Sequence, residues 1–183
     1  MVFSELDGGA YITAGILIAK HPETGVYNAS WNRCELTGGT KLRARMMPPQ
    51  HLGRYHAEAE DSGHNLPCAI VIGAPPSLMF SAAAKSPFET DELRVAGAWQ
   101  GAPLKVARCK TIPVEVPADA EIVIEGEVLA GLREDEGPFG EFTDNYVPIM
   151  KNHVFKVSAI THRRDAMYHA ILAGGTEDLN VVG

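Results

Sequence analysis

The chain has 183 residues, of which 45% are hydrophobic, and this is enough for the packed core of one ordinary domain. Its net charge of −7 argues against a nucleic-acid-binding protein, because phosphate contacts require a basic face. Three cysteines without a C-x-x-C pair, and the lack of a signal peptide or an apolar run of about 18 residues, predict reduced thiols in a cytoplasmic protein that does not span a membrane.

The first half of the chain alternates short apolar runs with turn residues, which is typical of strands. Residues 10–19 are almost entirely apolar and predict one strand buried on both faces. Further strands are expected over residues 26–31, 35–37 and 42–47. After these, Leu52, Tyr55 and Ala59 recur at helical spacing until Gly63, and this pattern predicts one helix.

The second half continues with strands and two further helical segments. Residues 78–84 are compatible with a helix, and Thr90-Asp91-Glu92 is typical of a helix start. Strands are expected over residues 67–73, 104–109, 121–128, 153–161 and 167–172. No repeat or linker divides the chain, so we expect one α+β, β-rich domain over residues 1–183, closer to a barrel than to a doubly wound sheet.

Two carboxylates lie five residues apart in the segment from Glu136 to Glu141. Gly137, Pro138 and Gly140 oppose a continuous helix or a central strand, so we expect the pair on a shaped loop. Two carboxyl groups in one pocket favour different protonation states, so that one stays ionised beside a cation while the other holds a proton. The segment therefore predicts either acid/base chemistry or a surface turn whose two acids face water.

Four more polar residues interrupt the local patterns. Asn28 and Arg33 bracket Trp31, whereas His51 and Glu92 each lie where a helix is expected to begin. Each has an ordinary explanation, as a turn residue, a solvated charge or a helix N-terminal residue favoured by capping or by the dipole. The chain contains no G-x-G-x-x-G or Walker A pattern, so the usual nucleotide-phosphate sites are not predicted.

Seven blocks run in one order along nearly the whole chain. They are Asp7-x-x-x-Tyr11-x-Thr13, Pro22-x-Thr24-Gly25, Asn28-x-x-x-x-Arg33, Leu66-Pro67-x-Ala69-Ile70-x-Ile72-Gly73, Asp91-Glu92-x-x-x-Ala96-Gly97, Val116-Pro117-Ala118-x-Ala120-Glu121-Ile122-Val123-x-Glu125-Gly126 and Glu136-Gly137-Pro138-Phe139-Gly140-Glu141. In order and spacing they resemble the UbiD family, reversible decarboxylases that use prenylated FMN. The resemblance implies a split β-barrel like that of the flavin reductases, with about three helices.

The resemblance also implies catalytic roles. Arg33 would pair with Glu136, and Glu141 would complete a Glu-Arg-Glu network over the flavin. Arg33 would hold the carboxylate of an aromatic or α,β-unsaturated acid by a bidentate fork, because a guanidinium matches carboxylate geometry. Glu141 would donate the proton that replaces CO₂, and Glu136 would keep Arg33 in place.

A flavin prenyltransferase would supply the cofactor, and the resemblance implies an ion that ties the cofactor phosphate to the protein. Asn28, His51 and Glu92 would bind Mn²⁺ or Mg²⁺, with K⁺ beside it, because oxygen and imidazole ligands suit these divalent ions. The residues expected to contact the cofactor are Asn28, Trp31, Arg33, Gln50, His51, Ala82, Ala83 and Glu92.

The chain departs from the family in length and in one segment. Family members carry an additional N-terminal segment and a large C-terminal α/β domain, and their Thr-Gly-Tyr-Tyr segment is replaced here by Thr143-Asp144-Asn145-Tyr146. A barrel without its second domain would expose apolar surface, so we expect a homo-oligomer. Two alternatives stay open: a non-catalytic flavin-binding subunit that needs a partner chain, and, from the barrel alone, an FMN reductase.

Overall fold

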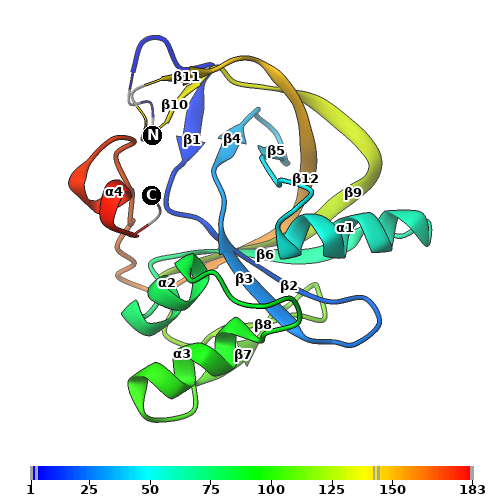
Figure 1. The fold of residues 1–183 in the computed structure, drawn as a ribbon, viewed down its shortest axis with the longest axis vertical. Helices are drawn as coiled ribbons and strands as arrows, with labels where there is room; N and C mark the ends of the chain where they lie inside the picture. The colour runs from blue at the N-terminus through cyan, green and yellow to red at the C-terminus, as the bar shows by residue number, and fades with distance from the viewer. Residues whose placement is uncertain (1, 3, 142, 144, 182–183) are drawn as a thin grey trace.

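The computed structural model describes residues 2, 4–141, 143 and 145–181. Its main feature is an eight-stranded antiparallel sheet with the order β1-β4-β5-β12-β9-β6-β2-β3. The strands are β1 (Ala10–Ile12), β2 (Ile16–Lys20), β3 (Tyr27–Trp31), β4 (Cys34–Leu36), β5 (Lys41–Ala44), β6 (Leu66–Ile72), β9 (Ile122–Glu136) and β12 (Met150–His162). The long strands β9 and β12 bend as they pair, with two register shifts, so the sheet curls into a half-barrel (Figure 1).

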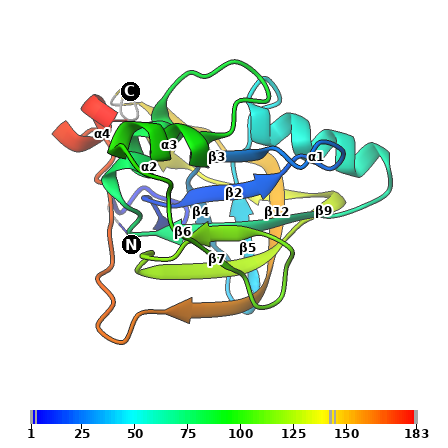
Figure 2. The same cartoon turned by 90° about the horizontal axis from the view of Figure 1, so that it is seen from below.

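Four helices and two small strand pairs complete the described part of the chain. The helices are α1 (His51–Asp61), α2 (Pro76–Ala83), α3 (Glu92–Gln100) and the short α4 (Thr176–Val181). The small pairs are β7 (Val106–Arg108) with β8 (Glu115–Pro117), and β10 (Phe139–Gly140) with β11 (Tyr146–Val147). Helices α2 and α3 pack on each other and on β3, and α1 lies apart from them, toward the bend of β9 (Figure 2).

The core lies on both faces of the central strands. Along β2, Leu17 and Ala19 belong to a cluster inside the curl, whereas Ile16 and Ile18 belong to a second cluster toward α2 and α3. Successive side chains of a strand point to opposite faces, so a strand covered on both sides reads as a continuous apolar run. The expectation of a strand buried on both faces is therefore confirmed for β2.

Several predicted boundaries are wrong, and tertiary pairing explains each. The strand expected over residues 10–19 is divided into β1 and β2 around Gly15, because β1 pairs with β4 while β2 pairs with β3 and β6. The strand expected over residues 167–172 does not form, and this segment instead runs past β1 with the Ile171 N–H donating to Thr13 Oγ1 at 3.0 Å. Strand β9 continues to Glu136, so this carboxylate ends a strand instead of lying on a loop.

The predicted fold class is confirmed: the chain is a β-rich half-barrel with three helices of eight or more residues and the short α4. The predicted helical segments correspond to α1, α2 and α3. Among the described residues no helix is both long and apolar enough to cross a membrane. Cys34, Cys68 and Cys109 are free.

Candidate active site

Arg33 joins the two acids that the sequence singled out. Its Nε and Nη2 donate to Oε1 and Oε2 of Glu136 at 2.9 and 3.1 Å, and its Nη1 donates to Oε1 of Glu141 at 2.9 Å. Arg33 lies between β3 and β4, and these strands are at separate positions in the sheet from β9, which ends in Glu136. Only the curl of the sheet brings the three side chains together.

Glu136 is the buried member of this set, since its side chain is fully inaccessible to solvent. Besides the two bonds from Arg33, its Oε2 accepts a hydrogen bond from Asn152 Nδ2 at 2.8 Å. Burial, followed by the negative charge of Glu136, raises the pKa of the nearby Tyr11 phenol, so this phenol stays neutral. A buried carboxylate with three charge-assisted or amide donors is well suited to fix an arginine.

The segment between the two acids is anchored at its backbone. Gly8 N–H donates to the Pro138 carbonyl at 2.7 Å, and Gly140 N–H donates to Asp7 Oδ1 at 3.3 Å. Gly137 has φ of 103°, a value that an L side chain rarely adopts, which explains the glycine there. The ring of Phe139 lies under Arg33, with the guanidinium carbon 4.6 Å from the ring centroid. These contacts present Glu141 to the same cavity as Arg33.

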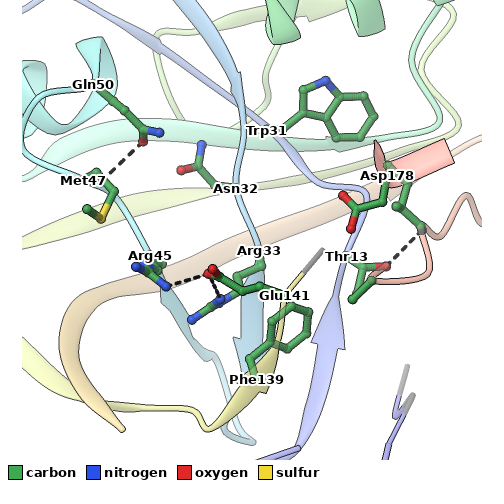
Figure 3. A pocket seen from close by; sticks show the side chains of 12 residues that line it. Thr13, Trp31, Asn32, Arg33, Arg45, Met47, Gln50, Phe139, Glu141 and Asp178 are labelled. Atoms are coloured by element: carbon green, nitrogen blue, oxygen red, sulfur yellow. Dashed lines mark hydrogen bonds and ion pairs between the residues drawn. The ribbon is translucent and has the colours of Figure 1, made fainter. Parts of the chain in front are cut away.

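The cavity beside Arg33 has a volume of about 300 Å³. Figure 3 shows Arg33 and Arg45 converging on Glu141, with Trp31 and Asp178 farther along the wall. Glu141 is the accessible acid, with 31% of its side chain exposed. The lining residues are Thr13, Trp31, Asn32, Arg33, Arg45, Met47, Gln50, Phe139, Glu141, Ile171, Ala173 and Asp178.

Asn28, His51 and Glu92 also converge. Glu92 Oε2 accepts hydrogen bonds from Asn28 Nδ2 and from the Ala29 N–H, both at 3.2 Å, and Glu92 Oε1 lies 3.8 Å from His51 Nδ1. Glu92 is the first residue of α3, and the Asp91 carboxylate caps this helix by accepting from the N–H groups of Leu93 and Arg94. The cap therefore fixes the direction from which Glu92 reaches into the site.

The chemistry of this second set fits a hard divalent cation. Burial raises the pKa of Glu92 to about 7, so a positive partner would favour its ionised form. Burial, with Arg54 second, lowers the pKa of His51 and favours the neutral imidazole that metals bind. The described residues contain no cluster of three His, Cys, Asp or Glu side chains arranged for a metal ion. A metal here would thus need the amide oxygen of Asn28 and further oxygen ligands.

A second cavity, of about 320 Å³, lies beside these three residues and shares Trp31 and Gln50 with the first. The Trp31 indole N–H donates to the Met79 carbonyl at 2.9 Å, and this bond holds the ring where the two cavities meet. All eight residues expected to contact a cofactor line one of the two cavities: Asn28, Trp31, Arg33, Gln50, His51, Ala82, Ala83 and Glu92. Together the cavities have the volume of a small-molecule site.

Several residues of the site were not predicted. Arg45 Nη1 donates to Glu141 Oε1 at 2.7 Å, and Asn152 and Asp178 also lie in or behind the first cavity. Arg45 lies within the strand predicted over residues 42–47, and no motif spacing connects it to Glu141. Of the segment that departs from the family pattern, Asp144 lies outside the described residues, and so does the neighbouring Phe142.

Comparison with protein families gives a match over residues 1–176 to the model described as "UbiD: 3-octaprenyl-4-hydroxybenzoate carboxy-lyase Rift-related domain". The anhydromevalonate phosphate decarboxylase of Methanothermobacter thermautotrophicus is 42% identical over 171 residues, which are 93% of this chain and 40% of that protein. A phenolic acid decarboxylase of Bacillus subtilis is 32% identical over 172 residues, or 92% of this chain and 36% of that protein. The chain thus spans well under half the length of these relatives.

Solved structures agree with these matches. The UbiD-class enzyme HmfF from Pelotomaculum thermopropionicum, in complex with FMN, superposes with a TM-score of 0.94 at 43% identity, covering 97% of this chain and 40% of that one. An evolved dimeric form of HmfF, in complex with prFMN, gives the same TM-score. Component B of nitrilotriacetate monooxygenase from Bacillus cereus, at 14% identity and a TM-score of 0.53 over 82% of this chain and 69% of that one, shares the fold.

Proposed function

This chain belongs to the UbiD family of carboxy-lyases, and from that premise we propose that it is the cofactor-binding domain of a decarboxylase. The domain would bind prenylated FMN and act on an aromatic or α,β-unsaturated carboxylic acid. Two similar structures hold FMN or prFMN, and the relatives named above are decarboxylases. The chain covers about 40% of these proteins, so activity of the whole protein is part of the proposal.

The observation that carries the proposal is one guanidinium held between a buried and an accessible carboxylate. Arg33 donates three hydrogen bonds to Glu136 and Glu141, and a guanidinium has five N–H donors. The two donors left over can hold a substrate carboxylate in the cavity that Arg33 lines. Glu136, which is fully buried, holds the guanidinium in place.

Glu141 would carry the proton. As the bond between the substrate carbon and its carboxylate breaks and CO₂ leaves, that carbon takes a proton from Glu141, and solvent reprotonates the acid. In the carboxylation direction the ionised Glu141 removes the same proton. Its partial exposure of 31% supports exchange with solvent, whereas Glu136 is sealed from it.

The second set of residues would hold the cofactor's phosphate through a metal ion. We propose that Asn28, His51 and Glu92 bind Mn²⁺ or Mg²⁺, since a buried carboxylate, a neutral imidazole and an amide oxygen suit such ions. The prenylated flavin supplies the electron-accepting chemistry that no amino-acid side chain offers. The K⁺ ion, the supply of the cofactor by a flavin prenyltransferase and self-association of the chain stay predictions.

Co-expression with a flavin prenyltransferase tests the proposal. The purified chain is expected to show a flavin spectrum, to bind manganese, and to release CO₂ from cinnamate or 4-hydroxybenzoate while incorporating solvent deuterium. Glu141→Gln should keep the flavin and lose CO₂ release and deuterium exchange. The control is Glu134→Gln, because Glu134 is an acid on β9 that pairs with Lys41 and Arg43; this variant should keep CO₂ release and exchange. A folded chain that binds neither flavin nor metal would refute the proposal.

A second candidate is a flavin-binding subunit that is inactive without a partner chain. The observation that favours it is that the decarboxylase activity of the named relatives belongs to proteins of which the matched residues make up only 36–40%. In that case the chain would bind prenylated FMN and manganese but release no CO₂ from either acid. Activity that appears only after a further polypeptide is added would support this candidate over the first.

A further inference from the structure

Arg45 lies directly beside Arg33. Strands β4 and β5 are antiparallel, with Cys34 opposite Ala44, and one step beyond this pair the Arg45 N–H faces the Arg33 carbonyl at 3.5 Å. The two arginines are therefore cross-strand neighbours, and both line the first cavity (Figure 3). Like charges directly opposite each other on a sheet are destabilising unless a counter-charge separates them.

Glu141 supplies that counter-charge through a single oxygen atom. Its Oε1 accepts from Arg33 Nη1 at 2.9 Å and from Arg45 Nη1 at 2.7 Å. Within the described residues, Arg33 has a second acid in Glu136, whereas Arg45 makes its ion pair with Glu141 alone. No described group donates to Oε2 of Glu141, so this oxygen is the one left for a proton.

We propose that Arg45 is a positioning residue for the proton donor. This inference rests on the proposed function of Glu141. Arg33 donates hydrogen bonds to Glu136 and, in the proposed function, to a substrate carboxylate. Arg33 alone would therefore hold Glu141 poorly when substrate is bound. Arg45 has no other acid among the described residues and no substrate to bind, so it holds Oε1 of Glu141 throughout the cycle. Oε2 of Glu141 then carries the proton toward the substrate carbon. A small displacement of a proton donor costs a large factor in rate.

The test uses the full chain loaded with prenylated FMN and whichever of cinnamate or 4-hydroxybenzoate it converts. Arg45→Gln is expected to lower kcat by about 10- to 100-fold and to change KM by less than about threefold. Arg45→Lys, whose ammonium group still donates to Oε1, should recover at least about tenfold of that loss. Lys41→Gln removes one positive charge from β5, the strand that ends just before Arg45, and should leave kcat unchanged because Lys41 pairs with Glu134.

A second measurement does not depend on turnover. In the flavin-free chain with ¹³C-carboxylate glutamate, the signal of Glu141 is assigned by its absence from Glu141→Gln. That signal should shift in Arg45→Gln and stay in place in Lys41→Gln. If the Glu141 signal shifts in Arg45→Gln but neither the parent chain nor any variant releases CO₂, the contact between Arg45 and Glu141 is confirmed and the proposed function is refuted.

Two outcomes would overturn the inference. One is an Arg45→Gln chain with unchanged kcat and an unchanged Glu141 signal. The other is an Arg45→Gln chain whose KM rises more than tenfold at constant kcat, because Arg45 would then bind the substrate itself. Equal melting temperatures of Arg45→Gln and Lys41→Gln would show that the loss of rate is not a loss of fold.

Discussion

Replacement of Glu136 by glutamine isolates the buried half of the carboxylate pair. The substitution keeps the size of the side chain but removes the acid that accepts from two N–H groups of Arg33. The Arg33 side chain is only 10% exposed, so its charge would be left buried with one acid fewer. Breaking a buried ion pair by removing one partner costs about 3–5 kcal/mol. Glu141 still contacts Arg33, so we expect a value near the lower limit, about 3 kcal/mol.

For a domain of 183 residues this loss corresponds to a melting temperature about 6–12 °C lower, measured by circular dichroism. Glu134→Gln is the matched control, since Glu134 lies two residues earlier on β9 and forms partly exposed pairs with Lys41 and Arg43 that are worth less than about 1 kcal/mol. Adding Arg33→Met to Glu136→Gln should restore part of the stability, because no buried charge is then unpaired. If Glu136→Gln melts within about 2 °C of Glu134→Gln, the reasoning is refuted.

Three further predictions follow from other parts of the structure. Burial lowers the pKa of His153 to about 4, so the unfolded chain binds more protons than the folded chain between about pH 4 and 6.5. Urea titrations should therefore show the free energy of unfolding rising by up to about 3 kcal/mol as the pH rises across this interval. A similar pH dependence in His153→Gln would contradict this assignment. Gly8→Ala should lower the melting temperature by the equivalent of about 1–3 kcal/mol, because its Cβ would collide with the Gly137 carbonyl; an unchanged melting temperature would count against the anchored loop. Glu92→Gln should reduce the manganese bound per flavin, measured by elemental analysis, by at least about tenfold, whereas the exposed Glu89→Gln should not.

Local sequence patterns were sufficient to predict the elements whose apolar periodicity continues along their whole length. The helical spacing of Leu52, Tyr55 and Ala59 predicted α1, because one face of a helix must be apolar wherever it packs. The apolar run that became β2 was recognisable for a similar reason, since both of its faces are covered. The C-terminal end of β9 is polar and has no apolar pattern that predicts a strand. It stays extended as far as Glu136 because it pairs with β12.

The candidate site shows the same division. Arg33, Glu136 and Glu141 were found through ordered motif blocks, and so were Asn28 and Glu92. His51 lies in none of these blocks; it was singled out as a polar residue at a predicted helix start, and the family resemblance gave it a role. Arg45 and Asn152 were missed, because a lone arginine within a predicted strand and a lone asparagine just before one have many ordinary explanations. Their importance depends on which side chains face them across the sheet, and a linear pattern does not contain that relation.

Residue types at set spacings were enough to recognise the family, the class of fold, the two acids and the arginine that joins them. Only the folded chain shows that the polar groups meet, that Glu136 is buried while Glu141 is open to solvent, and that a second arginine shares one oxygen of Glu141. These contacts depend on the curl of the sheet. Side chains separated by more than 100 residues become neighbours only when long strands bend and pair.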